Sequence, residues 1–186
     1  MLIRRECADD AAAIAAVHRG AFGPRYVNAA PSAEAGAVEN RDPGDPPEVD
    51  LVARLRSDSG WIPTLALVAV EYDAVIGHIC LTRASVGPFP VLGLGPIGVL
   101  PDHQGVGVGA ALMHAALGAA DALDEPLVGL LGSLDYYPQF GFVPAARLGI
   151  VPDDPAWVTH FQARPLTAYE PQITGEFHYA EPFYEL

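Results

Sequence analysis

The segment of residues 97–110 constrains the fold of this chain more than any other part of it. It reads Ile97-Gly98-Val99-Leu100-Pro101-Asp102-His103-Gln104-Gly105-Val106-Gly107-Val108-Gly109-Ala110. An apolar, strand-like start is followed by a proline, by a glutamine with glycines at three alternate positions, and by the start of an alanine-rich helix. A glycine turn that leads into a helix leaves backbone N–H groups free at the helix N-terminus, where they bind phosphate. The segment therefore predicts a strand, a turn and a helix that hold a phosphorylated ligand.

Two other interpretations of these glycines compete with that prediction. Gly105, Gly107 and Ala110 fit G-x-G-x-x-A, the fingerprint of dinucleotide-binding domains. In that fingerprint the strand runs directly into the first glycine, whereas residues 101–104 intervene here and the chain that follows is too short for the remaining sheet. A glycine turn without a ligand is the other alternative, and Gln104 together with the proline break argues against it.

The chain carries a strong negative charge, with 10 Lys and Arg against 23 Asp and Glu and a net charge of −13. A surface of this charge repels a phosphate backbone, so we expect no nucleic-acid partner. The charge either keeps the protein soluble in an acidic or saline cytoplasm or steers a cationic acceptor to it. The length of 186 residues suits a single domain, residues 1–186, that buries its own core.

The two cysteines, Cys7 and Cys80, form no CxxC pair, so we expect no metal site. Unpaired cysteines in apolar surroundings are typical of reduced thiols in a cytoplasmic protein. No apolar run reaches the roughly 18 residues that a membrane-spanning helix needs, so we expect no contact with a membrane.

Hydrophobic periodicity and breakers predict the secondary structure. Predicted strands cover residues 2–4, 65–71, 75–83, 91–100, 127–131 and 142–150, with a last one near 176–179. Predicted helices run from Asp9 or Asp10 to Gly23-Pro24, from Pro47 onward, over 110–123 and over 135–140. This order predicts one α/β (α+β) domain, whose mixed, mostly antiparallel sheet of about six or seven strands is flanked by about four helices.

The stretch from about residue 25 to residue 47 is rich in Ala, Pro, Glu and Gly. Loops of that length are usually functional or disordered, so we expect a long, mobile loop there.

Two motifs give the chain a family resemblance. The first is Gln104-Gly105-Val106-Gly107-Val108-Gly109, and the second is Tyr136-Tyr137-Pro138-Gln139-Phe140-Gly141-Phe142. Their sequences and relative spacing resemble the GNAT superfamily of N-acetyltransferases, whose signature is Q/R-x-x-G-x-G/A, and within it the bacterial YhbS-type members. The resemblance covers about residues 1–150 well and the remainder loosely.

The resemblance implies acetyl-CoA as co-substrate, a donor-binding core over about residues 65–145, and a fourth and fifth strand that splay apart. The pyrophosphate of acetyl-CoA would lie on the backbone of the glycine turn. Ile97 and Val99 would pair with the amides of its pantetheine arm. Pro96 and the glycines of this strand agree, because they disfavour regular pairing. The expected donor-binding residues are Ile97, Gly98, Val99, His103, Gln104, Gly105, Val106, Gly107, Val108, Gly109 and Ala110, with an oxyanion held by a main-chain N–H near Gly98 or Val99.

The resemblance also implies a catalytic tyrosine. Tyr137 aligns with the family's general acid, which protonates the departing thiolate, and its neighbour Tyr136 is the substitute. A buried aromatic ring that only packs against the sheet is the competing interpretation of Tyr137.

A general base is harder to identify, because residues 93–97 contain no carboxylate where many relatives place one. His78 and Glu39 are weak candidates, since a lone histidine in an apolar strand is usually structural and a loop carboxylate is usually solvated.

The acceptor site is expected to involve the 25–47 loop, the second helix and the C-terminal strands, about residues 146–186. We expect the aromatic residues there either to line an acceptor pocket, to form a homodimer face or to pack on the last strands. These residues are Tyr169, Phe177, Tyr179, Phe183 and Tyr184. The sequence thus predicts an N-acetyltransferase that acts on a primary amine of a small molecule or on an exposed amino group, by direct attack in a ternary complex. A non-catalytic acyl-CoA-binding module of the same fold is the alternative.

Overall fold

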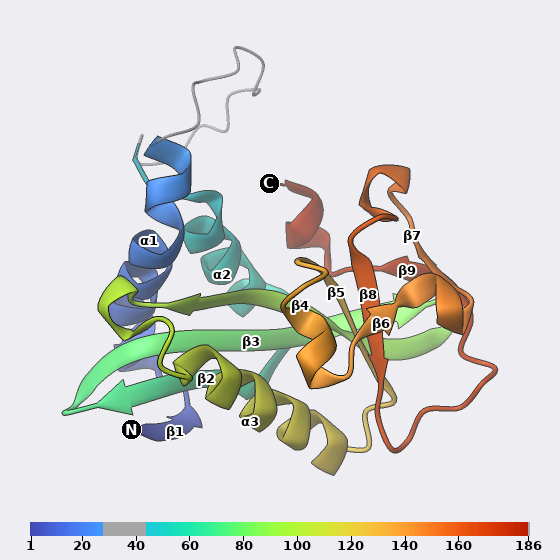
Figure 1. The fold of residues 1–186 in the computed structure, drawn as a ribbon, viewed down its shortest axis with the longest axis horizontal. Helices are drawn as coiled ribbons and strands as arrows, with labels where there is room; N and C mark the ends of the chain where they lie inside the picture. The colour runs from blue at the N-terminus through green and yellow to red at the C-terminus, as the bar shows by residue number, and fades with distance from the viewer. Residues whose placement is uncertain (28–43, 186) are drawn as a thin grey trace.

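The computed structural model describes residues 1–27 and 44–185. Its centre is a mixed sheet that separates helices on two sides (Figure 1). The described strands are β1 Leu2–Arg5, β2 Trp61–Glu71, β3 Ala74–Val86, β4 Phe89–Val99, β5 Leu127–Leu131, β6 Val143–Pro144, β7 Ile150–Pro152, β8 Phe161–Pro165 and β9 Gly175–His178. The described α-helices are α1 Ala11–Val27, α2 Pro47–Ser57 and α3 Val108–Ala122. Short 3-10 turns join them: η1 Ala8–Asp10, η2 Pro101–His103, η3 Tyr137–Phe140, η4 Ala145–Leu148, η5 Pro155–Trp157 and η6 Glu181–Glu185.

The sheet order is β1-β2-β3-β4-β5-β8-β6, and β9 joins the far end of β3 to β7. The pairs from β1 to β4 are antiparallel, and β2, β3 and β4 follow one another through tight turns. β4 and β5 are parallel because α3 crosses over between them. This mixed sheet confirms the predicted fold class. The described part has nine strands and three α-helices, whereas about six or seven strands and about four helices were expected.

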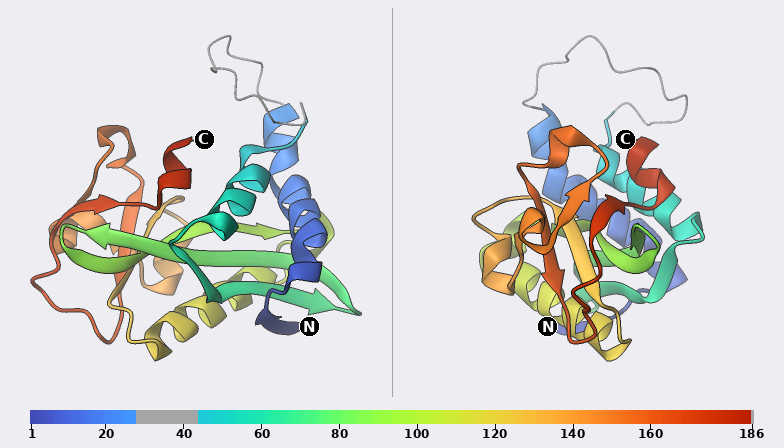
Figure 2. Two further views of the ribbon diagram at one scale, coloured as in Figure 1. Left: turned by 180° about the vertical axis from the view of Figure 1, so that it is seen from behind. Right: turned by 90° about the vertical axis from the view of Figure 1, so that its right-hand side faces the viewer.

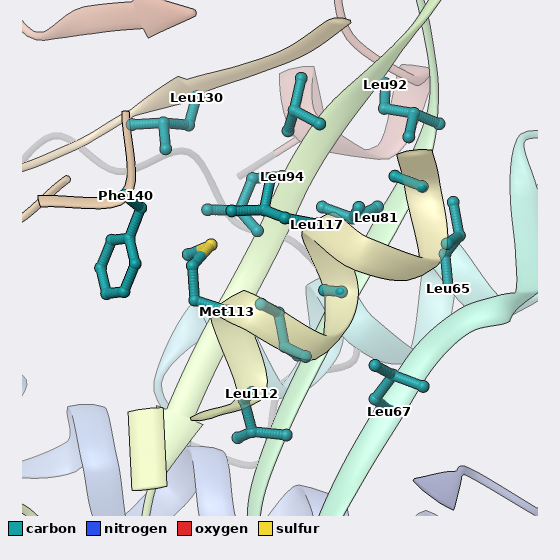
Figure 3. Close-up of a cluster of buried hydrophobic side chains, with 14 of the residues drawn as sticks. Leu65, Leu67, Leu81, Leu92, Leu94, Leu112, Met113, Leu117, Leu130 and Phe140 are labelled. Atoms are coloured by element: carbon teal, nitrogen blue, oxygen red, sulfur yellow. The ribbon is translucent and has the colours of Figure 1, made fainter. Parts of the chain in front are cut away.

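The helices cover opposite faces of the sheet, as the view from behind makes clear (Figure 2). Beneath α3, the buried side chains of Leu112, Met113 and Leu117 meet leucines of the central strands (Figure 3). On the other face, Ile14 of α1 and Val52 of α2 pack against Val68 of β2. Burial of apolar side chains on both faces explains why the central strands read as continuous apolar runs rather than as an alternation.

Several expected boundaries were wrong. The first helix does not end at Gly23-Pro24 but runs to Val27, because proline has a helical φ and forfeits only one backbone hydrogen bond. The strand predicted over 142–150 is divided into β6, η4 and β7. Gly149, with a φ of 69°, ends η4 in a left-handed conformation that a continuous strand would not contain.

The expected loop over 25–47 is only partly described. Residues 25–27 belong to α1, and Pro47 begins α2 at the position where proline suits a helix start. Residues 28–43, which include Glu39, lie outside the described residues. β8, which pairs with β5 along its whole length, was not predicted.

The predicted separation of β4 from β5 is confirmed. Among the described residues, the two strands pair only at Leu92–Val128 and Gly93–Gly129. The register of β4 against β3 then shifts between Leu94 and Ile97, because two residues of β4 stand opposite one residue of β3. These two residues are Gly95 and Pro96, and Pro96 has no N–H to give to a neighbouring strand. The sheet therefore opens beyond Gly93.

Two glycine substitutions test how tightly this region is packed. A Cβ atom on Gly129 of β5 would lie 2.4 Å from Cε2 of Phe177, a fully buried ring. Gly129→Ala should therefore lower the free energy of unfolding by about 1–3 kcal/mol. Gly118→Ala is the matched control, because Gly118 is exposed on α3 with no described atom within 4 Å of the new methyl group. It should raise the free energy by about 0.5–1 kcal/mol in urea titrations, and equal effects of both changes would contradict the packing argument.

Candidate active site

A cleft of about 710 Å³ lies where β4 and β5 separate. One half is formed by the end of β4, the start of α3 and the segment after β5. The other half is formed by α1, α2 and the C-terminal segments. The lining residues are Ala21, Phe22, Glu48, Leu51, Leu94, Gly95, Pro96, Ile97, Val99, Gln104, Gly105, Gly109, Leu131, Gly132, Ser133, Tyr136, Tyr137, Trp157, Tyr179 and Phe183.

The last residues of β4 direct alternate main-chain groups into this cleft. The N–H of Leu100 donates to the carbonyl of Ile76, which fixes the alternation of the antiparallel β3–β4 pair. It follows that the N–H and C=O of Ile97 and Val99 point away from β3, toward the gap, while those of Gly98 point at β3. A Cβ on Gly98 would also lie 2.9 Å from Nδ1 of His18 on α1, so Gly98 serves the packing of that helix.

The glycine turn after β4 has the backbone that only glycine adopts easily. Gly105 and Gly107 have φ values of 74° and 96°, and no described atom lies within 4 Å of the Cβ position of either residue. Gly107 is the N-cap of α3, so the helix begins at Val108 rather than at the predicted residue 110. The free N–H groups of this helix end lie beside Gly105 and Gly109, which line the cleft.

The side chain of Gln104 links this turn to β4, because its Nε2 donates to the carbonyl of Val99 at 2.9 Å. His103 is turned toward β2, with Nδ1 3.7 Å from a carboxylate oxygen of Glu71. Val106 is exposed, whereas the side chain of Val108 is buried in the core under α3. Of the expected donor-binding residues, the structure thus brings Ile97, Val99, Gln104, Gly105 and Gly109 to the cleft and leaves Gly98, His103, Val106, Gly107, Val108 and Ala110 outside its lining.

Both tyrosines of the second motif line the cleft. Tyr137 begins η3 and packs so closely on Gly132 that a Cβ there would lie 2.2 Å from its ring. Its other face meets Phe142, with the ring centroids 5.8 Å apart. The Tyr136 hydroxyl lies 3.2 Å from the Cβ position of Gly109, and partial burial raises the pKa of Tyr136. Tyr137 thus packs between Gly132 and Phe142, whereas the Tyr136 hydroxyl lies beside Gly109 at the start of α3.

His78 is placed inside the fold and not at the cleft. Its Nε2 lies 3.0 Å from Glu6, and its Nδ1 lies 2.8 Å from Nε2 of His18. Both imidazoles are completely buried, and Glu6 also accepts a hydrogen bond from Arg56 at 2.7 Å. Because Glu6 is ionised, His78 donates to it and accepts from His18, so both histidines are neutral. His18 Nδ1 is left without a hydrogen-bond partner among the described residues.

Burial and hydrogen bonds together set the pKa values of Glu6, His18 and His78. Desolvation lowers the pKa of His18 to about 3, with the neighbouring His78 adding to the effect, and burial also lowers the pKa of His78. Burial by itself would raise the pKa of Glu6, but the hydrogen bonds from His78 and Arg56 lower it to about 2. We therefore treat His78 as structural.

The C-terminal aromatic residues separate into two groups. Tyr179 and Phe183 line the cleft, and Phe177 lies in the core with no exposed surface, while Tyr169 packs on the same cluster. Tyr184 stacks on Trp157, with centroids 5.9 Å apart. Phe22, Glu48 and Trp157 also line the cleft and were not anticipated, because nothing in the local sequence around them differs from ordinary helix or turn residues.

Within residues 1–27 and 44–185, the structure contains no group of three or more His, Cys, Asp or Glu side chains that could hold a metal ion. No helix in this part of the chain is long and apolar enough to cross a membrane.

Comparisons with known proteins identify similar sequences and structures. Residues 36–142 match the family model described as "Acetyltransferase (GNAT) family". The chain is 34% identical over 154 residues to YjhQ of Escherichia coli K12, described as an uncharacterized N-acetyltransferase, covering 78% of this chain and 84% of that protein.

Two solved structures resemble the whole fold. One is the GNAT family N-acetyltransferase YhbS from Escherichia coli in complex with CoA, with a TM-score of 0.79, 25% identity and coverage of 98% of this chain and 91% of that chain. The other is a GNAT family acetyltransferase from Brucella melitensis in complex with acetyl-CoA, with a TM-score of 0.72, 29% identity and coverage of 98% and 97%.

The buried histidines predict a dependence of stability on pH. Their pKa values are lower in the folded than in the unfolded chain, so the unfolded chain binds more protons and stability falls as the pH drops below about 6.5. Each histidine that must stay neutral contributes about 1.4 kcal/mol per pH unit to this slope. The free energy of unfolding in urea, measured between pH 7.5 and pH 5.5, should show the decline.

His18→Gln removes one of the two protonation sites and should reduce the slope by about half, although it also lowers stability at pH 7.5. His160→Gln, at an exposed position, controls for the substitution itself. An unchanged slope in His18→Gln would contradict the assignment of a buried, neutral pair.

Proposed function

Because the chain belongs to the acetyltransferase (GNAT) family, we propose that it transfers the acetyl group of acetyl-CoA to a primary amine, which attacks the thioester directly in a ternary complex. The observation that carries this proposal is the row of main-chain groups along the open edge of β4, which ends at the glycine turn before α3. The two solved relatives hold CoA and acetyl-CoA. A pantetheine arm with two amides suits such an edge, since each amide can pair with a strand.

In this proposal, the donor's pyrophosphate binds the N–H groups of residues 105–110 at the start of α3, where the helix dipole favours an anion. The amides of the pantetheine arm pair with Ile97 and Val99. Gly98 is left out of the donor-binding set, because its main chain pairs with β3. The bond from Gln104 to the Val99 carbonyl holds the turn against the strand.

The chemistry then requires three events. The neutral amine attacks the thioester carbonyl, and a main-chain N–H of β4 stabilises the oxyanion, for which Val99 is the candidate that faces the cleft. The new C–N bond forms, the C–S bond breaks, the nitrogen releases one proton to solvent water, and the departing thiolate takes one proton from an acid. A phenol has a pKa of about 10 and so carries its proton at neutral pH, which lets Tyr137 pass that proton to the sulfur as the C–S bond breaks.

We also propose that residues 1–186 form one domain in which residues 65–145 bind the donor and residues 146–186 complete the acceptor side. Cys7 and Cys80 are both free thiols, which suits the reducing cytoplasm as the location of the protein.

The glycine turn provides a test of donor binding. Acetyl-CoA at about 100 times its dissociation constant should stabilise the wild type by about 2.7 kcal/mol in thermal unfolding. Gly107→Val should weaken acetyl-CoA binding at least about 10-fold in titration calorimetry, because a β-branched residue resists a φ of 96° and the turn must change.

Gly87→Val is the matched control, since Gly87 has a φ of 53° in the β3–β4 turn outside the cleft lining. Its affinity for acetyl-CoA should equal that of the wild type. Wild-type affinity in Gly107→Val would place the pyrophosphate elsewhere.

The two tyrosines provide a test of the acid. Tyr137→Phe should lower kcat about 100-fold, measured as release of free CoA thiol, while the acetyl-CoA dissociation constant stays unchanged. Tyr136→Phe should retain a kcat close to that of the wild type. If the loss appears in Tyr136→Phe instead, the proton donor is Tyr136 and Tyr137 is a packing residue.

A further inference from the structure

The half of the cleft away from the glycine turn has its own chemical character. We call it the acceptor half and define it by six lining residues: Phe22, Glu48, Leu51, Trp157, Tyr179 and Phe183. Four of these side chains are aromatic, and they come from α1, η5 and the C-terminal segment. Glu48 and Leu51 come from the first turn of α2, where the helix dipole favours a carboxylate.

The aromatic side of the acceptor half is held in place before any ligand binds. The Tyr179 ring packs against Phe183 with centroids 4.4 Å apart and against Trp157 at 5.9 Å. The N–H of Tyr179 donates to the Tyr184 hydroxyl at 2.9 Å, and that hydroxyl donates to Asp153. Tyr184 also stacks on Trp157. A ligand therefore meets a preformed surface and loses little affinity to ordering it.

The charges of the acceptor half favour one sign. Glu48 is the only charged side chain among the cleft-lining residues of the described part of the chain. An ammonium group is attracted both by a carboxylate and by the faces of aromatic rings. A carboxylate or phosphate on the acceptor would meet Glu48 and rings, with no basic side chain among the described lining residues to pair with it.

We infer that the acceptor half selects amines that carry an apolar or aromatic body and no anionic group. This inference rests on the proposed function, because it names the acceptor class for the same cleft. The ammonium group is held near Glu48 and the body lies against the aromatic rings. The ammonium group passes one proton to solvent water, and the neutral amine then attacks the thioester. An α-amino acid has the same amine and body but adds a carboxylate, and is excluded on that ground.

Matched pairs of acceptors test the inference. Phenethylamine is compared with phenylalanine, and hexylamine with 6-aminohexanoate, at saturating acetyl-CoA, with release of the CoA thiol as the readout. We expect kcat/KM to be at least about 100-fold higher for each amine than for its carboxylate-bearing partner, as expected for an unpaired charge in a desolvated site.

Substitution of Glu48 separates recognition from donor binding. Glu48→Gln should raise KM for phenethylamine about 10-fold or more, with the acetyl-CoA dissociation constant unchanged. Asp50→Asn is the matched control, because Asp50 lies in the same turn of α2, pairs with Arg54 and does not line the cleft. It should leave KM for phenethylamine at the wild-type value.

These experiments separate the acceptor class from the proposed acetyltransferase function. Equal kcat/KM values within both pairs, or an unchanged KM in Glu48→Gln, would overturn the acceptor class while the acetyltransferase proposal stands. Acetyl-CoA binding without acetylation of phenethylamine or hexylamine would overturn it as well. Failure of the wild type to bind acetyl-CoA would overturn the proposed function itself, and the acceptor class with it.

Discussion

The rest of the structure depends on one interruption in the pairing of β4. The strand is bonded on both sides only as far as Gly93, and then an extra residue and Pro96 leave the side toward β5 without a partner. An unpaired strand edge inside a protein is normally a liability, because its N–H and C=O groups need partners. Here the loss of pairing creates both the cleft and the row of main-chain groups that faces it. The chain thus leaves the main-chain groups of Ile97 and Val99 without a partner strand, at the place where we propose that a ligand with amide groups binds.

The glycines of β4 allow neighbouring side chains to pack closely against the strand. A Cβ atom on Gly93 would lie 2.7 Å from the ring of Tyr179, and one on Gly95 would lie 2.5 Å from Sγ of Cys80. The aromatic side of the acceptor half and the packing of β3 therefore both depend on positions that carry no side chain. This explains why a strand with so little β-propensity occupies the centre of the sheet. The missing side chains of Gly93 and Gly95 leave room for Tyr179 and for Cys80 of β3.

The parts of the fold that the sequence predicts are those with strong local signals. The hairpin of β2 and β3, the glycine turn and β5 follow from periodicity and from turn residues. The open pairing of β4 follows from the family resemblance, with which Pro96 and the glycines of β4 agree. The helix that continues past Gly23-Pro24 was mispredicted because proline is compatible with a helical φ. The segment after Phe142 was mispredicted because η4 and the left-handed Gly149 divide it.

The candidate site divides in the same way. The residues of the glycine turn and Tyr137 stand in recognisable motifs, so the donor half of the cleft could be outlined from the sequence. Glu48 and Trp157 reach the cleft from α2 and η5, which lie far from the glycine turn in the sequence. Their neighbours in the sequence carry no motif, and long-range packing alone defines the acceptor half.

The buried pair of His18 and His78 has a consequence for how the first helix finds its place. Glu6 precedes α1, His18 lies within it, Arg56 ends α2, and His78 lies in β3, so the chain of hydrogen bonds closes only when four separate segments have met. If α1 were shifted by one residue on the sheet, Val17 or Arg19 would replace His18 beside His78, and the hydrogen bond between the two buried imidazoles would be lost. The network thus works as a check on the rotational setting of α1, which decides whether Phe22 faces the cleft or the solvent.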